Sequence, residues 1–360
     1  MADPRAFPGL AHWKTAACVP LTGDASARKY FRLSAGGQTA ILMDASQVPD
    51  SVGPFVRIAK QLRKLGFSAP EILARDSDSG LLLLEDFGDD TFAALLEGRP
   101  IQSGKRKAES GKGEPPTHAK GELKAEIQGD IPGLMGTPAG PPDTSAEHLF
   151  TLATDVLIAL HRQPQAVPEN LREYHTERML EDIELFVQWR TPQVTPQEKE
   201  DFRAVWRAVL PLALQVPESL LLRDYHVANL MLLPERTGIQ QVGLLDFQDA
   251  YRGPVTYDLV SLLEDARRDV PEALQNHLRE RYLAAFPALD RETFETSLAI
   301  LAAQRHTRVL GIFERLARHE GKLDYRRRHS PRVERRLQQA LRHPRLSAVK
   351  DWMERHALTE

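Results

Sequence analysis

Short apolar runs separated by turn residues dominate the first ninety residues, which is the pattern of β-strands. One stretch, residues 52–65, instead places apolar side chains at helical spacing, and Gly66 follows it as a helix terminator. The pattern therefore predicts a small β-rich region that contains one helix. The predicted strands cover residues 17–21, 29–33, 39–43, 71–74 and 81–84.

Helical spacing dominates the second half of the chain. Helices are predicted over residues 146–161, 177–189 and 196–214, the last with Thr195 as N-cap and Pro196 at its first position. Two short apolar strands, 220–233 and 241–246, interrupt this pattern, and from Pro254 onward it is helical. The order predicts an α+β protein with two lobes: a β-rich N-terminal lobe over residues 1–88 and a larger, mostly helical lobe over residues 145–360.

The segment between these lobes has a different composition. Residues 89–144 begin with helical spacing, and from about residue 98 they are rich in Gly, Pro, Lys, Glu and Ser. No aromatic residue occurs from residue 93 to 149, so the segment cannot bury enough apolar surface to offset the entropy of ordering. We expect a disordered insertion over residues 98–144; a regulatory or docking segment is the alternative.

Composition narrows the class of protein. The 360 residues carry 47 Lys and Arg against 50 Asp and Glu, a net charge of −3, which gives no reason to expect a nucleic-acid or membrane partner. Cys18 is the one cysteine, so a disulfide framework is excluded. No apolar run approaches the roughly 20 residues of a membrane span, and the N-terminus lacks a signal-peptide pattern. We expect a soluble cytoplasmic protein.

Two acidic residues at the ends of apolar strands carry the strongest chemical signal. Asp224 follows the first strand and precedes Asn229 by five positions, and Asp246 ends the second strand. In a phosphotransfer site one carboxylate orients the acceptor hydroxyl and takes its proton, while an Asn and an Asp hold Mg²⁺ against the phosphates. Asp and Asn are also common turn residues, but here their order and a separate β-rich lobe favour a kinase.

The motifs around these residues resemble the aminoglycoside-phosphotransferase/choline-kinase superfamily, whose fold is protein-kinase-like. Within it the chain is most similar to bacterial kinases of the anomeric hydroxyl of N-acetylmuramate and N-acetylglucosamine, which serve cell-wall recycling. The resemblance spans nearly the whole chain outside the insertion. Its motifs are RDYHVAN (223–229), LDFQDA (245–250), GDASARKYFR (23–32), MDA (43–45), GPVTYDL (253–259), SLLEDARR (261–268) and QRH (304–306).

The resemblance implies an enzyme that uses ATP as co-substrate and Mg²⁺ as cofactor, with Asp224 as catalytic base and Asn229 and Asp246 as metal ligands. It also places the adenine edge at the connection after the fifth strand; whether ATP or GTP is preferred stays open. The residues expected to bind the nucleotide are Gly23, Ser26, Arg28, Arg32, Glu85, Asp86 and Phe87.

Three departures from the superfamily pattern matter. Leu222 stands where many members have a supporting His, and the phosphate loop has a single glycine, Gly23. The third strand has no lysine and residues 52–65 have no glutamate, so both halves of the usual ion pair are missing. Arg28, Lys29 and Arg32 are the nearby side chains that could contact phosphate instead.

Charge gives some information about the acceptor. The last third of the chain is basic, which disfavours a polycationic aminoglycoside and is compatible with a neutral or anionic amino sugar. An aminoglycoside kinase or another small-alcohol kinase remains an alternative, and so does a nucleotide-binding pseudokinase without activity. Tyr257 and Asp258 are expected to support the catalytic loop. The candidate sugar contacts are Asp249, Asp265, Arg267, Arg268 and His306.

Overall fold

The computed structural model describes residues 13–21, 27–102 and 142–357, which form two compact units. Unit 1 is drawn from Met1–Leu152 and Ala228–Gln248, and unit 2 from Ala153–Val227 and Asp249–Glu360. The residues around Asn229 and Asp246 therefore group with the N-terminal part of the chain, whereas the predicted boundaries assigned them to the helical lobe. Most of the predicted insertion, 98–144, lies outside the described residues.

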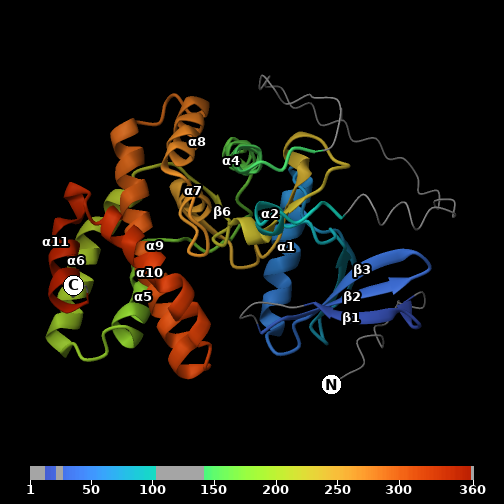
Figure 1. The fold of residues 1–360 in the computed structure, drawn as a ribbon, viewed down its shortest axis with the longest axis horizontal. Helices are drawn as coiled ribbons and strands as arrows, with labels where there is room; N and C mark the ends of the chain where they lie inside the picture. The colour runs from blue at the N-terminus through green and yellow to red at the C-terminus, as the bar shows by residue number, and fades with distance from the viewer. Residues whose placement is uncertain (1–12, 22–26, 103–141, 358–360) are drawn as a thin grey trace. The chain divides into compact units, whose positions relative to one another are not determined.

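A five-stranded sheet is the frame of unit 1. Its strands are β1 (Ala17–Leu21), β2 (Lys29–Ala35), β3 (Gln38–Asp44), β4 (Ile72–Asp76) and β5 (Leu81–Glu85). They lie in the order β1-β2-β3-β5-β4, and every neighbouring pair is antiparallel. Strands β1, β2 and β3 are labelled in Figure 1. The five predicted strands are confirmed, with ends that differ by at most two residues.

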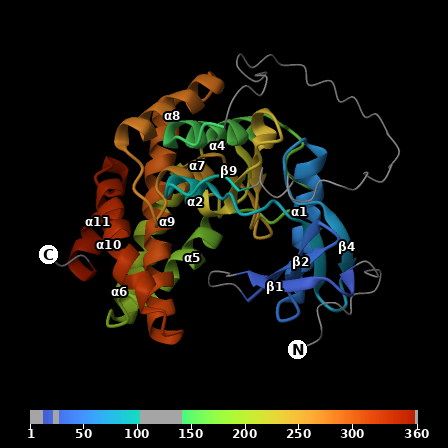
Figure 2. The ribbon, with the colours of Figure 1, turned by 45° about the vertical axis from the view of Figure 1, so that its right-hand side comes forward.

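Apolar side chains cover both faces of this sheet. Successive side chains along a strand point to opposite faces of the sheet. The buried pair Met43 and Leu82 therefore lies on one face, and the buried pair Leu42 and Leu83 lies on the other. Helix α1 (Val52–Lys64) runs alongside the sheet (Figure 2), as its apolar spacing predicts. One face is filled by the cluster Trp13, Ala16, Leu33, Ala40, Leu42 and Leu83.

The predicted strand over residues 220–233 is wrong, because the polar residues near its middle break it in two. Strand β6 (Glu218–Leu221) pairs with β9 (Tyr251–Pro254) in unit 2, and the 3-10 helix η3 (Val227–Asn229) follows it. Strand β7 (Leu230–Leu232) pairs with β8 (Val242–Leu244) in unit 1, with η4 (Gly238–Gln241) between them. Each Asp of the predicted site therefore follows a strand of a different two-stranded sheet.

Unit 2 is organised around the long helix α9, which contacts α5, α6, α7 and α10 (Figure 1). The helices of the second half are α4 (Ala146–His161), α5 (Thr176–Trp189), α6 (Pro196–Ala213), α7 (Thr256–Leu263), α8 (Glu272–Ala285), α9 (Arg291–His319), α10 (Leu323–Ala340) and α11 (Ser347–His356). The described residues also form the short elements η2 (Pro49–Ser51), α2 (Phe92–Leu96) and η5 (Pro344–Leu346). No helix within the described ranges has the length and apolar character needed to cross a membrane.

Local capping and close packing account for two features of unit 2. Thr195 caps α6 as predicted: its side chain accepts the N–H of Glu198, whose carboxylate accepts the N–H of Thr195 in return. Gly311 lets α9 approach α5 closely, because a Cβ at this position would lie 2.5 Å from the carbonyl carbon of Leu185 and from the nitrogen of Phe186.

We predict that Gly311→Ala destabilises the protein by about 3 kcal/mol, because the backbone of α5 cannot give way as a flexible side chain would. Chemical denaturation would show the lower midpoint. Gly53→Ala in α1 is the matched control: nothing lies within 4 Å of the added Cβ, so it should stabilise by up to about 1 kcal/mol. Equal midpoints for the two variants would contradict the packing argument.

Candidate active site

Asp224 ends a short turn after β6, and a carboxylate from α7 fixes the backbone of this turn. Asp258 Oδ2 accepts the N–H of Leu222 at 2.6 Å, and its Oδ1 accepts the N–H of Arg223 at 2.8 Å. Arg223 adopts a φ of 74°, a left-handed conformation that is strained for a residue with a side chain. The two hydrogen bonds that Asp258 accepts therefore stabilise the strained residue that precedes Asp224.

The side chain of Arg223 is buried in a network of polar and aromatic groups. Its Nη2 donates to Asp182 Oδ2 at 2.7 Å, and its guanidinium lies 5.2 Å from the ring centroid of Tyr251. Asp182 also accepts hydrogen bonds from the hydroxyl of Tyr174, at 2.8 Å, and from Arg178. Because buried charges are stable only when they are paired, Asp182 is the residue that allows Arg223 to be buried.

Two arginines of α9 control the charge of Asp224. Burial by itself raises the pKa of the Asp224 carboxyl, but the positive charges of Arg308 and Arg305 outweigh it and hold that pKa below its usual range. The charges of His226 and Arg223 act in the same direction. Asp224 is therefore an anion at neutral pH that can accept a hydrogen bond from a hydroxyl group.

Tyr257 and Arg305 link α7 to the same turn. The guanidinium of Arg305 lies 5.6 Å from the ring centroid of Tyr257. Its Nη1 donates to the Tyr257 hydroxyl at 3.4 Å and to the carbonyl oxygen of Arg223 at 3.3 Å. Tyr257 and Asp258 thus contact groups beside Asp224, as a supporting role requires, and that role remains a prediction.

Asn229 and Asp246 lie in unit 1. The N–H of Leu245 donates to the carbonyl oxygen of Asn229 at 3.0 Å, which ties the residue before Asp246 to the end of η3. Asp246 has a φ of 58° and a side chain that is 40 % exposed, and Gln248 Nε2 donates to its Oδ1 at 2.8 Å. A carboxylate oxygen and an amide oxygen are hard ligands that fit Mg²⁺.

Within the described ranges, no group of three or more His, Cys, Asp or Glu side chains is placed to hold a metal ion. A magnesium ion at Asn229 and Asp246 would therefore need further oxygen ligands. Phosphates and water supply such ligands in sites that bind Mg²⁺ through one or two carboxylates.

The predicted phosphate-binding residues differ in what they contact. Gly23 and Ser26 lie outside the described residues. Arg28 Nη2 donates to Asp246 Oδ1 at 3.1 Å, and its side chain is 11 % exposed. Lys29 is exposed. Arg28 is therefore the cation that the described residues place at the predicted metal ligand.

Arg32 is held in a clamp at the end of β5. Its Nε and Nη2 donate to the two carboxylate oxygens of Asp86, at 2.7 and 3.0 Å. Its Nη1 donates to Asp89 Oδ1 at 2.8 Å, and its Nη2 also donates to the carbonyl oxygen of Gly88 at 2.9 Å. Bidentate pairing of this kind is strong and directional. Arg32 and Asp86 therefore stabilise the connection after β5.

The other two residues of this connection lie close to the β7–β8 hairpin. Glu85 forms an ion pair with Arg236, whose guanidinium lies 5.2 Å from the ring centroid of Phe87. Phe87 packs in a small apolar cluster with Met231 and Leu233. The predicted adenine edge thus has a buried apolar cluster beside it, and its contact with the base remains a prediction.

The candidate acceptor residues differ in burial and in the groups that they contact. Asp265 is buried, and Arg267 Nη1 lies 3.5 Å from Nε2 of His226, two positions after Asp224. Asp249 is exposed and Arg268 is partly exposed, and their role as sugar contacts remains a prediction. His306 is buried, and its Nε2 lies 2.8 Å from Glu264 Oε2, which gives its ring a partner inside unit 2.

Sequence reasoning missed the partners of Asp224. It counted Arg305 and Arg308 as part of a generally basic C-terminal third, whereas both act electrostatically on Asp224. Their spacing of three positions places them on one side of a helix, a usable signal. Asp182 lies among the buried, mostly apolar positions of α5. A carboxylate at such a position predicts a buried partner of opposite charge.

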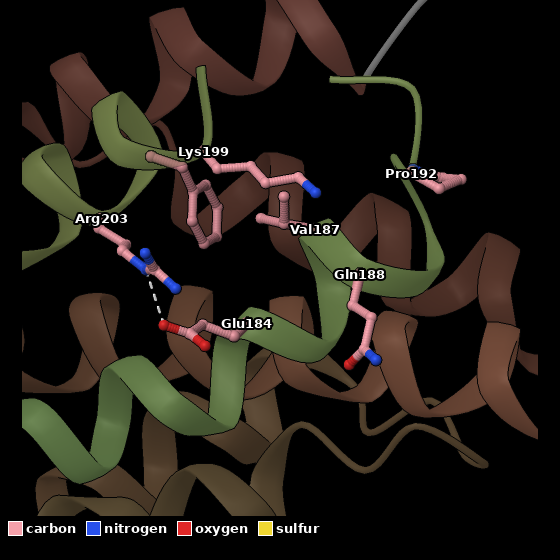
Figure 3. A pocket seen from close by; sticks show the side chains of 7 residues that line it. Glu184, Val187, Gln188, Pro192, Lys199 and Arg203 are labelled. Carbon is pink, nitrogen blue, oxygen red and sulfur yellow. Dashed lines mark hydrogen bonds and ion pairs between the residues drawn. The ribbon is translucent and has the colours of Figure 1, made fainter. Parts of the chain in front are cut away.

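A surface pocket of about 230 Å³ lies elsewhere in unit 2, between α5 and α6 (Figure 3). An ion pair between Glu184 and Arg203 closes one side of it, and Lys199 reaches across it. None of the predicted site residues lines it.

Three comparisons relate the chain to known proteins. A family model described as "Phosphotransferase enzyme family" matches residues 17–294. An N-acetylmuramate/N-acetylglucosamine kinase of Caulobacter vibrioides is 31% identical, with 94% of this chain and 92% of the relative covered. A protein of the same name from Pseudomonas aeruginosa is also 31% identical, with 85% of this chain and 79% of the relative covered.

Solved structures agree on the fold at low sequence identity. A choline/ethanolamine kinase family protein from Mesorhizobium loti matches with a TM-score of 0.58 and 15% identity, over 97% of this chain and 96% of that one. A GDP complex of an aminoglycoside 2'-phosphotransferase-IIIa mutant matches with a TM-score of 0.57 and 11% identity, over 94% and 96%. The predicted α+β, protein-kinase-like fold is thereby confirmed.

We predict that Asp258→Ala destabilises the protein by about 2–4 kcal/mol, because the N–H groups of Leu222 and Arg223 lose their buried acceptor. Urea denaturation at neutral pH would measure the loss. Asp324→Ala is the control, since the Asp324 side chain is 74 % exposed. A change of less than about 0.5 kcal/mol for Asp258→Ala, the range of surface substitutions, would contradict the assigned brace.

Asp258→Ala should also remove part of the pH dependence of the free energy of unfolding. Burial raises the pKa of Asp258 to about 7, although the N–H groups of Leu222 and Arg223 lower it. The usual value is about 4, so this group's contribution to stability is complete below about pH 4 and is lost as the pH rises through 7. Between pH 5 and 8 the wild type should lose on the order of 2 kcal/mol from this group, and Asp258→Ala should not.

Proposed function

The chain belongs to the phosphotransferase enzyme family, and we propose that it transfers the γ-phosphoryl group of ATP to the anomeric hydroxyl of N-acetylmuramate or N-acetylglucosamine. The observation that carries the proposal is Asp224, a carboxylate held ionised by Arg305 and Arg308 on a turn whose backbone is fixed. The names of the relatives from two bacterial genera support the choice of sugars. An ATP-dependent reaction supports the proposal of a cytoplasmic location, where ATP is available.

The chemistry suits a weakly basic carboxylate. In the transfer, a bond forms between the anomeric oxygen and the γ-phosphorus, the bond from that phosphorus to the bridging oxygen of ADP breaks, and the hydroxyl proton passes to Asp224. An anomeric hydroxyl is a hemiacetal and is more acidic than an ordinary alcohol. Asp224 therefore mainly orients the hydroxyl in line with the phosphorus, a role for which a low pKa is no obstacle.

Asn229 and Asp246 are the residues that would hold Mg²⁺. When bound, the ion neutralises charge on the phosphate oxygens. The connection at Glu85, Asp86 and Phe87 would accept the adenine, with the apolar cluster around Phe87 beside it.

Arg28 takes the place of the missing third-strand lysine in this proposal. It is a partly buried cation that already contacts Asp246, whereas Arg32 is bonded to Asp86 and Asp89. A guanidinium offers several donors, so Arg28 can turn from the carboxylate to a phosphate oxygen when nucleotide binds.

Phosphorus NMR of the product tests the function directly. With either sugar, the product should be acid-labile and show coupling between phosphorus and the position-one proton. A 6-phosphate, or turnover of kanamycin or choline but of neither sugar, would overturn the proposal. ATP binding without turnover of any acceptor would favour a pseudokinase.

We predict that Asp224→Asn lowers kcat by about 10²–10⁴, the range expected for a general base, while nucleotide affinity is retained. Coupled-assay kinetics and calorimetry with ATP would measure the two quantities. A variant that keeps more than about a tenth of wild-type kcat would exclude Asp224 as the base.

We predict that Arg28→Ala weakens the binding of Mg·ATP about tenfold or more, and that Arg28→Lys recovers part of the loss. Calorimetry with Mg·ATP is the measurement, and Lys29→Ala, at the exposed neighbouring position, is the control. If Arg28 merely occupied Asp246, its removal would instead tighten binding, and that result would contradict the assigned role.

A further inference from the structure

The loop between α7 and α8 forms a polar cluster beside the turn that carries Asp224. Arg267 Nη1 lies 3.5 Å from His226 Nε2 and 3.8 Å from Asp265 Oδ1. Asp265 Oδ1 also accepts the N–H of Arg267 at 2.9 Å. The electrostatic environment of His226 includes Asp265, Arg267 and Asp224, so these four residues form one charged neighbourhood within unit 2.

One oxygen of this cluster is buried without a bond. Asp265 is 2 % exposed, yet its Oδ2 has no hydrogen-bond partner among the described residues. Leaving a buried carboxylate oxygen unsatisfied costs free energy, and such atoms in native proteins call for an explanation. A ligand hydroxyl or amide N–H would supply the missing donor.

A second atom nearby has the same property. His329 of α10 has a buried Nδ1 with no hydrogen-bond partner in the described part of the chain, and the charges of Arg267 and Asp265 act on its ring. That ring lies 6.0 Å from both Phe313 and Tyr325, measured between centroids. Polar atoms beside aromatic rings are what a sugar needs, because its ring has both hydroxyl groups and apolar C–H faces.

Helix α10 holds this loop in place. Arg332 Nη1 donates to the carbonyl oxygen of Ala266 at 3.3 Å, and Arg332 Nε lies 2.9 Å from Asp269 Oδ1. Arg336 lies 3.8 Å from the same carboxylate oxygen. The loop that carries Asp265 and Arg267 is therefore held by α10 at Ala266 and at Asp269, which favours a preformed binding site.

We propose that Asp265 and Arg267 form the acceptor-recognition pair of this enzyme and divide the task between them. Asp265 Oδ2 accepts a hydroxyl or amide N–H that both amino sugars carry, and Arg267 binds the carboxylate that distinguishes N-acetylmuramate from N-acetylglucosamine. The inference rests on the proposed function, since it assigns the two halves of the acceptor to the same site.

The charges favour this division. The Arg267 side chain is 36 % exposed, so it can reach a ligand, and a guanidinium binds a carboxylate through two parallel hydrogen bonds. The buried Asp265 carboxyl has oxygens that attract a hydrogen-bond donor and do not attract a second carboxylate. Arg267 can therefore bind the carboxylate, and Asp265 can accept a hydrogen bond from the neutral part of the sugar.

Steady-state kinetics of the full-length protein with both sugars tests the role of Arg267. Arg267→Gln keeps a hydrogen-bonding side chain without the charge, so the ratio of kcat/KM for N-acetylmuramate to that for N-acetylglucosamine should fall about tenfold or more. Arg328→Gln, at a side chain that is 73 % exposed on α10, is the control and should leave the ratio as it is.

The outcomes separate the two proposals. Equal losses with both sugars, or no change in the ratio, would overturn the role of Arg267 while leaving the sugar-kinase function intact. If the wild type phosphorylates neither sugar, the function itself fails and the inference fails with it.

Asp265→Asn tests the other half. An asparagine Oδ1 can still accept the N–H of Arg267, but its Nδ2 replaces the unsatisfied Oδ2 with a donor. KM should rise about tenfold for both sugars while the thermal midpoint stays close to that of the wild type. Unchanged KM values would overturn the assignment, and so would a lower midpoint with no selective loss of sugar binding in calorimetry.

Discussion

The buried carboxylate of Asp258 is the constraint on which unit 2 depends. It accepts two consecutive backbone N–H groups, those of Leu222 and Arg223, at the point where β6 ends and a left-handed residue begins. Without an acceptor there, the turn would leave two buried donors unsatisfied and would relax from its strained conformation. The position of α7 therefore determines where Asp224 lies, and the pairing of β6 with β9 brings the start of α7 to that position.

The same turn requires a balance of charge. Arg223, Arg305 and Arg308 surround a turn whose acidic partners are Asp182, Asp224 and Asp258. Removing one member leaves an opposite charge buried and unpaired, which costs far more than the pair gains over a hydrophobic substitute. The network is thus weak evidence for stability and strong evidence that the position and ionisation of Asp224 matter.

The sequence was informative where a pattern was local. Apolar spacing and turn residues predicted the five strands of unit 1 and the Thr195 cap. They also predicted that Asp224 and Asp246 follow apolar strands. Strand β9 was missed because its residues YRGP contain Gly and Pro, which argue against a strand, and pairing with β6 overrides that preference. Ion pairs between distant residues, such as Arg32 with Asp86 or Arg28 with Asp246, have no local signal, since the fold alone brings them together.

The distribution of bonded carboxylates also bears on the acceptor. A polycationic ligand needs several acidic groups that are ready to accept its ammonium donors. Asp182 is bonded to Tyr174, Arg178 and Arg223, and both oxygens of Asp258 are bonded to backbone N–H groups. Of the buried carboxylates around the Asp224 turn, Asp265 has an oxygen that no group in the described part of the chain satisfies, and Arg267 stands beside it. One hydrogen-bond acceptor next to a guanidinium suits a sugar that has a donor group near a carboxylate. The same arrangement disfavours a ligand that carries several positive charges.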